Sequence, residues 1–181
     1  MADEPRLLPL FPLHTVLFPH MEMPLRIFEP RYRQMLEVCQ AQDSMFGVAL
    51  IRSGQEVGGP AQPFEVGTIA HIDAVQPRPD GTLAVTITGR RRFHLAEVVQ
   101  NRPYMVGLVQ PLDEVEGGDL RGPMAEAVTL AQNTLRRMLG LNGEWSNRVP
   151  LPRDAARLSY ALAERLPLEV LPQQELLEAR T

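Results

Sequence analysis

The sequence predicts an α+β protein, with a strand-rich first part that contains one inserted helix and a second part made of helices alone. Short apolar runs separated by turn residues recur up to residue 111, a pattern typical of small all-β units. From residue 123 onward, apolar residues recur at helical spacing. Because an acidic, glycine-rich segment separates the two patterns, we predict two domains. They are a β-barrel over residues 1–111 and a helical subdomain over residues 112–181, packed on or beside it.

The first strands are short apolar segments, at residues 7–11, 24–29, 45–51 and 66–75. Proline interrupts the first segment, which favours a place near a sheet edge because proline donates no backbone hydrogen bond. A third and a fourth strand follow the hairpin described next, one with Phe93, Leu95 and Val99, the other with Tyr104, Val106 and Leu108. Many short strands of this kind predict a small closed or nearly closed barrel.

A β-hairpin is expected around residue 80. Pro79-Asp80-Gly81 is a tight-turn sequence, since proline presets φ and glycine accepts a positive φ. Residues 82–88 then alternate, with Leu83, Val85 and Ile87 on one face. Alternation directly after a turn predicts two antiparallel strands joined at Asp80-Gly81.

One helix, near residues 30–42, interrupts the strands. Pro30 suits the first helical position. Tyr32, Met35, Leu36 and Cys39 follow at i, i+3, i+4 and i+7 and form one apolar stripe. Cys39 is therefore interpreted as a small core residue.

Three helices are expected in the second part. The first opens at Pro123, carries Arg136 and Arg137 in its last turn and is capped by Gly140. The second runs from about residue 154, and a short third one covers residues 173–179. The apolar stripes of the first two helices contain Met124, Val128, Ala131, Leu135 and Met138, and Ala155, Leu158, Leu162 and Leu166.

Composition excludes several classes of chemistry. All eighteen basic residues are arginine, and the absence of lysine removes the Walker A motif, Schiff-base chemistry and lysine-assisted serine nucleophiles. The net charge of −4 and a pI near 5.6 disfavour nucleic acid as a partner. No apolar run is long enough to cross a membrane, the N-terminus does not resemble a signal peptide, and a single cysteine fits the cytoplasm.

No catalytic, metal or cofactor motif is recognisable. The four histidines lack metal-ligand spacing, no serine lies in a nucleophile elbow, and no dinucleotide-binding glycine motif occurs. We therefore expect no enzymatic activity, no metal and no cofactor. The one basic cluster, Arg90-Arg91-Arg92, lies on a predicted strand, where Arg90 and Arg92 would share a face. Together with Arg102 they are the candidate contacts for a nucleic acid.

Three ordered motifs resemble the Lon protease N-terminal domain, also called the Lon substrate-binding domain. They extend from residue 7 to about residue 110, and the C-terminal helices fit the family more loosely. The motifs are Leu8-Pro9-Leu10 with residues 16–21, Pro24-Leu25 and Phe28-Glu29-Pro30-Arg31-Tyr32; residues 65–70; and residues 79–82 with Gly89 and Arg92-Phe93.

The resemblance implies a PUA-like β-barrel followed by a helical bundle. In the full proteases this region helps to recognise and hold polypeptide substrates and assists assembly. Without motor and peptidase domains, the chain is expected to be a stand-alone, non-catalytic polypeptide-binding or adaptor module. The alternative is an RNA-binding module that uses the PUA-like barrel. The expected partner is a polypeptide or unfolded protein segment, no membrane is involved, and a homo-oligomer is compatible with the sequence.

Two groups of residues are candidates for the binding site. Val16, Phe18, Met21 and Met23 belong to an apolar, methionine-containing segment that is interpreted either as a peptide-binding surface or as part of the barrel core. Trp145 lies in a polar loop and is interpreted either as an interface anchor or as the cover of a helix end.

The polar residues of the family motif, Glu29, Arg31 and Tyr32, form the second group. They are either a binding site or a structural junction. In the structural interpretation Tyr32 packs inward while Arg31 or Arg26 pairs with Glu29.

Overall fold

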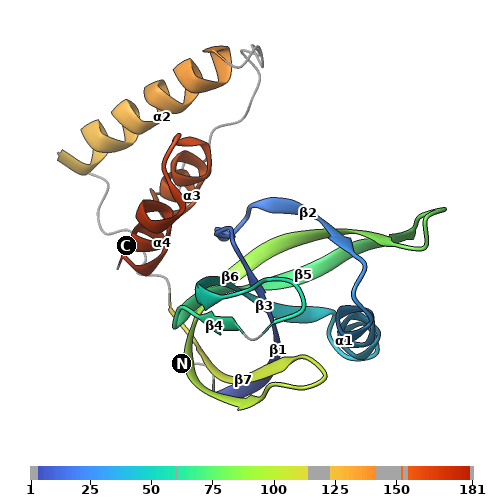
Figure 1. The fold of residues 1–181 in the computed structure, drawn as a ribbon. Coiled ribbons are helices and arrows are strands. Elements are labelled where there is room, and N and C mark those ends of the chain that lie inside the picture. Colours follow the sequence, from blue (N-terminus) through green and yellow to red (C-terminus); the bar gives the residue numbers. More distant parts are fainter. Residues whose placement is uncertain (1–3, 60, 114–122, 142–151, 153–154, 180–181) are drawn as a thin grey trace. The chain divides into compact units, whose positions relative to one another are not determined.

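The computed structural model describes residues 4–59, 61–113, 123–141, 152 and 155–179. The chain forms two compact units, Met1–Asp113 and Glu114–Thr181, and Figure 1 labels their elements. The first unit is an α+β structure built around a mostly antiparallel sheet, and the second is helical. No described helix has the length and apolar character needed to cross a membrane.

The first unit holds seven strands and one helix among its described residues. Its sheet has the order β1-β7-β6-β5-β3-β4, and β2 pairs with β6. β1 also pairs in parallel with β3, so the pairings of β1, β7, β6, β5 and β3 return to their starting strand. The elements are β1 (Arg6–Leu13), β2 (Glu22–Ile27), α1 (Pro30–Gln40), β3 (Met45–Gly54), β4 (Ala61–Pro63), β5 (Val66–Pro77), β6 (Leu83–Gln100) and β7 (Met105–Pro111).

β1 has a partner on both sides, so the expected place near a sheet edge is wrong. Residues 6–10 pair with β7 and residues 10–13 pair with β3. Pro9 lies in the half that pairs with β7 and Pro12 in the half that pairs with β3. Because each half of the strand pairs along one side in this register, each proline can leave its missing donor on the other side.

The predicted hairpin is confirmed in β5 and β6. The two strands pair antiparallel up to Pro77 and Leu83. Gly81 has a φ of 78°, which a residue without a Cβ adopts without strain. Val85 and Ile87 are buried, as the alternation predicts.

β6 is a single strand of 18 residues, not the two strands that the sequence predicts. The register against β5 shifts between Gly89 and Arg91, and the register against β7 shifts twice between Leu95 and Gln100. Each shift adds one unpaired residue and reverses the side-chain alternation. Val98 therefore packs on the core, whereas Val99 is 47% exposed.

Side chains on both faces of β7 are covered. Tyr104 and Val106 join one cluster of buried side chains, and Met105 and Val109 join a second. The alternation of Tyr104, Val106 and Leu108 describes one of these faces. The more deeply buried Val109 lies on the other.

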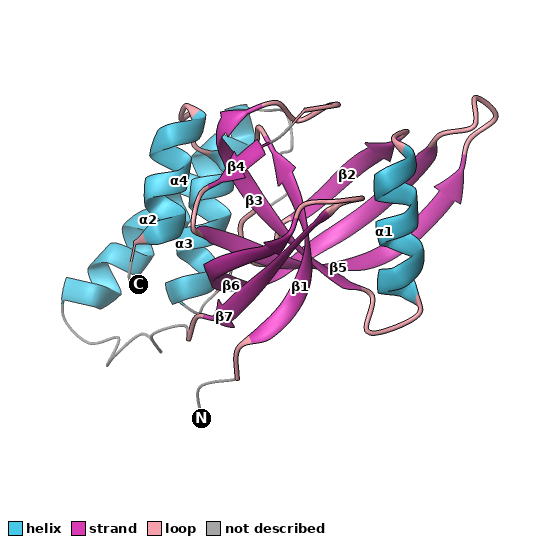
Figure 2. Ribbon diagram, turned by 60° about the horizontal axis from the view of Figure 1, so that its bottom comes forward, coloured by secondary structure: helices cyan, strands magenta, loops and turns pink. Residues whose placement is uncertain are grey.

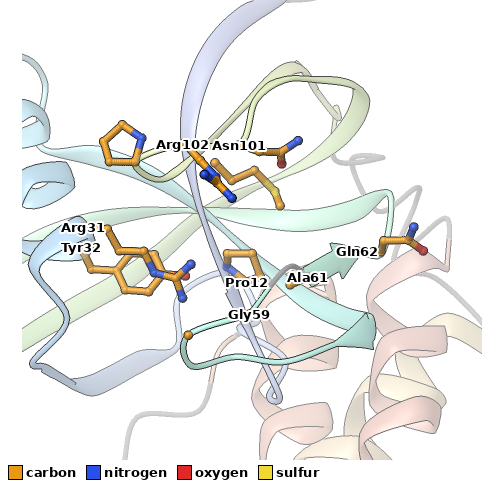
Figure 3. A pocket seen from close by; sticks show the side chains of 11 residues that line it. Pro12, Arg31, Tyr32, Gly59, Ala61, Gln62, Asn101 and Arg102 are labelled. Atoms are coloured by element: carbon orange, nitrogen blue, oxygen red, sulfur yellow. The ribbon is translucent and has the colours of Figure 1, made fainter.

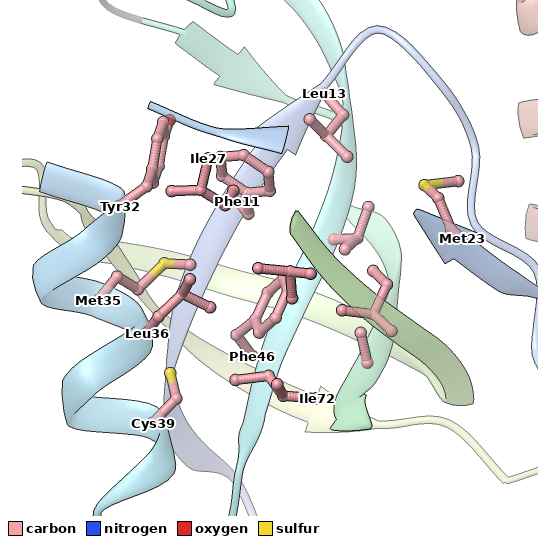
Figure 4. Close-up of a cluster of buried hydrophobic side chains, with 14 of the residues drawn as sticks. Phe11, Leu13, Met23, Ile27, Tyr32, Met35, Leu36, Cys39, Phe46 and Ile72 are labelled. Carbon is pink, nitrogen blue, oxygen red and sulfur yellow. The ribbon is translucent and has the colours of Figure 1, made fainter. Parts of the chain in front are cut away.

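α1 forms as predicted, with Pro30 in its first turn and the expected stripe of four buried residues. Figure 2 shows the helix beside the strands of the first unit. Its stripe packs into the larger cluster, which Figure 4 shows in close-up. The ring centroids of Phe11 and Tyr32 lie 4.1 Å apart, edge to face. The ring of Phe46 follows at 6.2 Å from that of Phe11.

The second unit contains α2 (Pro123–Leu141), α3 (Ala155–Arg165) and α4 (Val170–Glu178). Leu158 is buried against Val128, Ala131 and Leu162, in agreement with the expected stripes. α2 continues through Gly140, so Arg136 and Arg137 do not lie in its last turn. The expected C-terminal bundle is not evident from the described residues.

Candidate functional site

The segment that contains Val16, Phe18, Met21 and Met23 is mostly buried. Val16 is 3%, Phe18 1% and Met23 7% exposed, and Met21 is half-buried. These residues therefore present no apolar patch to a partner in this structure, and their arrangement favours the core interpretation.

Gly89 explains why this segment lies so close to the sheet. The His20 amide donates to the Gly89 carbonyl at 2.8 Å, and the Gly89 amide donates to the Met21 carbonyl at 2.9 Å. The Thr68 hydroxyl donates to the Leu17 carbonyl at 2.5 Å. A Cβ added at Gly89 would lie 2.3 Å from the Phe18 carbonyl oxygen. A side chain at position 89 would therefore push the segment off β6.

The candidate nucleic-acid contacts do not form one surface. Arg92 is 3% exposed, because the register shift at residue 90 places it on a different face from Arg90. Arg90 lies 3.6 Å from Asp73, and Arg91 pairs with Asp113 and donates to the Leu112 carbonyl. Arg102 lines a different pocket from the one that Arg90 and Arg91 line. The expectation that Arg90 and Arg92 share a face is wrong.

Trp145, the remaining candidate for a peptide contact, lies outside the described residues. Both of its interpretations stay predictions. Among the described residues, no group of three or more histidine, cysteine or acidic side chains is arranged to hold a metal ion.

A pocket of about 710 Å³ opens beside the first turn of α1 (Figure 3). Its walls come from four places in the first unit: β1, the start of α1, the region from the β3–β4 connection into β4, and the turn between β6 and β7 into the start of β7. Pockets of this volume are in the range that accepts ligands. The lining residues are Pro12, Arg31, Tyr32, Gly58, Gly59, Ala61, Gln62, Asn101, Arg102, Pro103 and Met105.

Glu29, Arg31 and Tyr32 lie together at the start of α1, beside this pocket. The Nη2 atom of Arg31 lies 3.0 Å from an Oε2 atom of Glu29. The guanidinium carbon of Arg31 is 4.5 Å from the centroid of the Tyr32 ring. Tyr32 is 6% exposed, and burial raises the pKa of its hydroxyl despite the opposing effect of Arg31. Arg26 pairs elsewhere, with Asp80 at 2.8 Å.

Residues 55–59, which follow β3, are hydrogen-bonded to Glu29 and Arg31. The Gly58 amide donates to Glu29 Oε2 at 3.2 Å, and Arg31 Nη2 donates to the Glu56 carbonyl at 3.2 Å. The carboxylate of Glu56 in turn accepts from the His14 amide at 2.8 Å. Sequence reasoning did not place this loop at the site. Its glycine pair is the only local signal, because the partners lie far away in the chain.

Two exposed apolar side chains lie next to the same residues. Phe28 and Val57 are each 50% exposed, and both line a small hollow of about 30 Å³. Tyr32 lines this hollow as well as the larger pocket, so the two depressions share this residue. We call the surface formed by Phe28, Arg31, Tyr32, Val57 and Arg102 the α1 corner.

Comparison with known proteins gives the family. A family model described as the ATP-dependent protease La (LON) substrate-binding domain matches residues 7–181. The chain belongs to the Lon substrate-binding domain family. Three residues of the α1 corner, Phe28, Arg31 and Tyr32, fall within the first family motif found in the sequence.

Solved structures agree with this assignment. The Lon N-terminal domain protein from Xanthomonas campestris is 32% identical and superposes with a TM-score of 0.75, covering 97% of this chain and 91% of that one. The N-terminal domain of Mycobacterium avium complex Lon protease has the same TM-score and coverage at 20% identity, and therefore supports the fold.

Sequence relatives of this Lon substrate-binding domain are much longer proteins. Lon protease 2 of Herpetosiphon aurantiacus is 31% identical over 94% of this chain, and the match covers 22% of that protein. Lon protease of Syntrophus aciditrophicus is 25% identical, with 23% covered. The chain thus spans less than a quarter of these curated relatives.

Proposed function

We propose that this Lon substrate-binding domain recognises unfolded polypeptide segments at the α1 corner and acts by binding, with no catalytic step of its own. One observation carries the proposal: a pocket of about 710 Å³ adjoins two half-exposed apolar side chains, Phe28 and Val57. Membership of a substrate-binding family makes a polypeptide the favoured ligand. For the fold, we propose a PUA-like barrel, which the pairing of β1 with both β7 and β3 supports.

The chemistry of the α1 corner suits a polypeptide. Phe28 and Val57 offer apolar contact area to side chains of a bound segment, and such contacts dominate binding when they become desolvated. The adjoining pocket offers side-chain donors from Arg31, Asn101 and Arg102 for polar groups of the same segment. Because Glu29 and Arg31 fix the loop that carries Val57, little ordering is needed on binding, which favours affinity.

The alternative, RNA binding by the barrel, receives less support. Of the candidate arginines, Arg92 is buried, Arg90 lies beside an acidic residue, and Arg102 lines a pocket that the others do not line. Arg91, between the first two, also pairs with an acidic residue. A phosphate backbone needs a continuous cationic track, and binding to it weakens steeply with salt.

The experiment is a titration of the purified chain with a fluorescently labelled, permanently unfolded model protein and, separately, with a labelled RNA oligomer, at low and at moderate salt. We expect binding of the unfolded protein that persists at moderate salt, because apolar contacts are not screened. Phe28→Ser and Val57→Ser should each weaken this binding several-fold. Each substitution removes a half-exposed apolar side chain, and with it the apolar area that this side chain would bury against the ligand.

Leu7→Ser is the matched control. Leu7 is 62% exposed on β1 and lines none of the described pockets, so its substitution removes surface hydrophobicity without touching the α1 corner. Binding that is unchanged by Phe28→Ser and Val57→Ser would move the site elsewhere. Salt-sensitive RNA binding without binding of the unfolded protein would overturn the proposed function.

A further inference from the structure

The charged residues that line the pocket at the α1 corner are all of one sign. Of the eleven described residues that line it, two are charged, and both are arginine. Glu29 and Glu56 lie nearby, but they line the small hollow on the other side of Tyr32. Because Arg31 is paired with Glu29, the uncompensated positive charge at the pocket is that of Arg102, in a chain whose net charge is −4.

Arg31 retains unused donors. Its Nη2 atom serves both Glu29 and the Glu56 carbonyl, whereas its Nε atom is buried and has no hydrogen-bond partner in the described part of the chain. A guanidinium carries five N–H donors in a fixed planar arrangement. All described hydrogen bonds of the guanidinium use Nη2, so the N–H groups of Nη1 are the donors left for a ligand acceptor, because the Nε atom is out of reach of the pocket.

Arg102 lies on the turn between β6 and β7 and is exposed. No hydrogen bond or ion pair engages its side chain among the described residues. Figure 3 shows Arg102 beside Asn101 on one side of the pocket and Arg31 beside Tyr32 on another. Asn101, next to Arg102, adds a neutral amide to the same wall. Arginine pairs with planar anions through parallel hydrogen bonds, and carboxylate is the planar anion that polypeptides carry.

We propose that the pocket binds a carboxylate group of the polypeptide, supplied by an acidic side chain or by the C-terminus and held between Arg102 and Arg31. The inference rests on the proposed function, because it specifies which polypeptides the α1 corner prefers. The preferred segment has apolar side chains for Phe28 and Val57 and a carboxylate close to them, since Tyr32 borders both depressions.

The test uses three fluorescent peptides with the same apolar residues. The first has aspartates and a C-terminal amide, the second has asparagines and a free C-terminal carboxylate, and the third has asparagines and a C-terminal amide. We expect at least one carboxylate peptide to bind the full chain about tenfold more tightly than the neutral peptide, which is the size of a charge-assisted hydrogen bond. The first two peptides show which source of carboxylate the pocket accepts.

Arg102→Gln should abolish this preference, so that the carboxylate peptides and the neutral peptide bind the variant with the same affinity. Arg78→Gln is the matched control, because Arg78 is also an exposed arginine on a turn but lines none of the described pockets. The preference should also shrink as salt rises. The thermal midpoint of each variant, measured in parallel, should match that of the wild type, because Arg102 has no described contact to lose.

Each other result contradicts the inference in a recognisable way. Equal binding of all three peptides would overturn the carboxylate site and leave the proposed function standing. Retention of the preference in Arg102→Gln, or its loss in Arg78→Gln as well, would show that general charge and not this pocket is responsible. Binding of none of the peptides would overturn both the inference and the proposed function.

Discussion

Tyr32 projects inward from the first turn of α1, with its ring edge against Phe11 and the guanidinium of Arg31 over its face. We expect Tyr32→Ala to lower the free energy of unfolding by about 3–5 kcal/mol, because it removes a buried aromatic ring and leaves a cavity. Denaturant melts measure this change. Tyr32→Phe, the control, keeps the ring and should lose far less. A melt of Tyr32→Ala that coincides with the wild type would show that this face of α1 is not part of the core.

Cys39 makes stability depend on pH at the alkaline end. Burial, assisted by the charge of Asp43, raises the pKa of its thiol to about 11, whereas an unfolded cysteine titrates near 8.5. Between these values the unfolded chain has lost the proton that the native chain retains. The free energy of unfolding should therefore fall as pH rises through this window, by at most about 1.4 kcal/mol per pH unit for one proton.

Urea melts of the reduced protein at a series of pH values from neutral to about 10.5, a range spanning the unfolded thiol's titration, test this expectation. Cys39→Ala, which cannot titrate, should be less stable at neutral pH but should lose less stability on going to pH 10. An identical slope in the two proteins would assign the alkaline loss to other groups, of which Tyr32, with its raised pKa, is the first to examine.

At the scale of elements, β6 and the segment over it depend on one missing side chain. Gly89→Ala places a methyl group 2.3 Å from the Phe18 carbonyl oxygen, and backbone cannot yield as a flexible side chain can. We expect a loss of about 1–3 kcal/mol, typical of overpacking. Hydrogen exchange of the His20 and Gly89 amides should also accelerate, because their hydrogen bonds to the Gly89 and Met21 carbonyls open.

Gly59→Ala is the control for this substitution. A Cβ there meets only the side chain of Gln55, at 3.0 Å, so the methyl group can be accommodated. If Gly89→Ala were as stable as Gly59→Ala and kept its amide protection, the segment over residues 16–21 would not depend on close approach to β6.

The elements that could be predicted are those whose signals are local. The stripe on α1 lies within eight residues, and the turn at Asp80-Gly81 lies within three. The bulges of β6 could not be predicted, because one unpaired residue leaves no mark in the sequence. The position of β1 in the sheet could not be predicted either, because its two partner strands, β3 and β7, lie far from it in the sequence.

At the scale of the whole molecule, the three clusters of buried side chains found among the described residues each stay within one unit. The two large clusters contain residues from Leu8 to Val109, and the described helical cluster contains residues from Val128 to Leu162. We expect a fragment of residues 1–113 to fold alone with a cooperative thermal transition, because it contains a complete core and has the size of an ordinary domain. Circular dichroism and calorimetry measure this, with the full chain as the reference.

An unfolded or aggregated fragment would show that the first unit needs the second for its stability. The α1 corner lies entirely in the fragment, so peptide binding should survive the truncation. The site itself could be foreseen only in part. The family motif led to Arg31 and Tyr32, but Val57 and Arg102 join them through the path of the sheet, and no spacing in the sequence reports that proximity.

The pairing of β1 with β7 bears on how the protein is made. Arg6 lies opposite Val109, and Leu10 opposite Met105, so β1 is made well before β7 and waits for it before it gains that neighbour. Until then the apolar residues of β1 lack the neighbours that β7 provides in the native fold. Forming a contact between residues so far apart in the sequence is slow compared with forming a helix or a hairpin. The nascent chain therefore carries an unfinished sheet until β7 has been made, and during that time it has the exposed apolar character of the segments that we propose it binds.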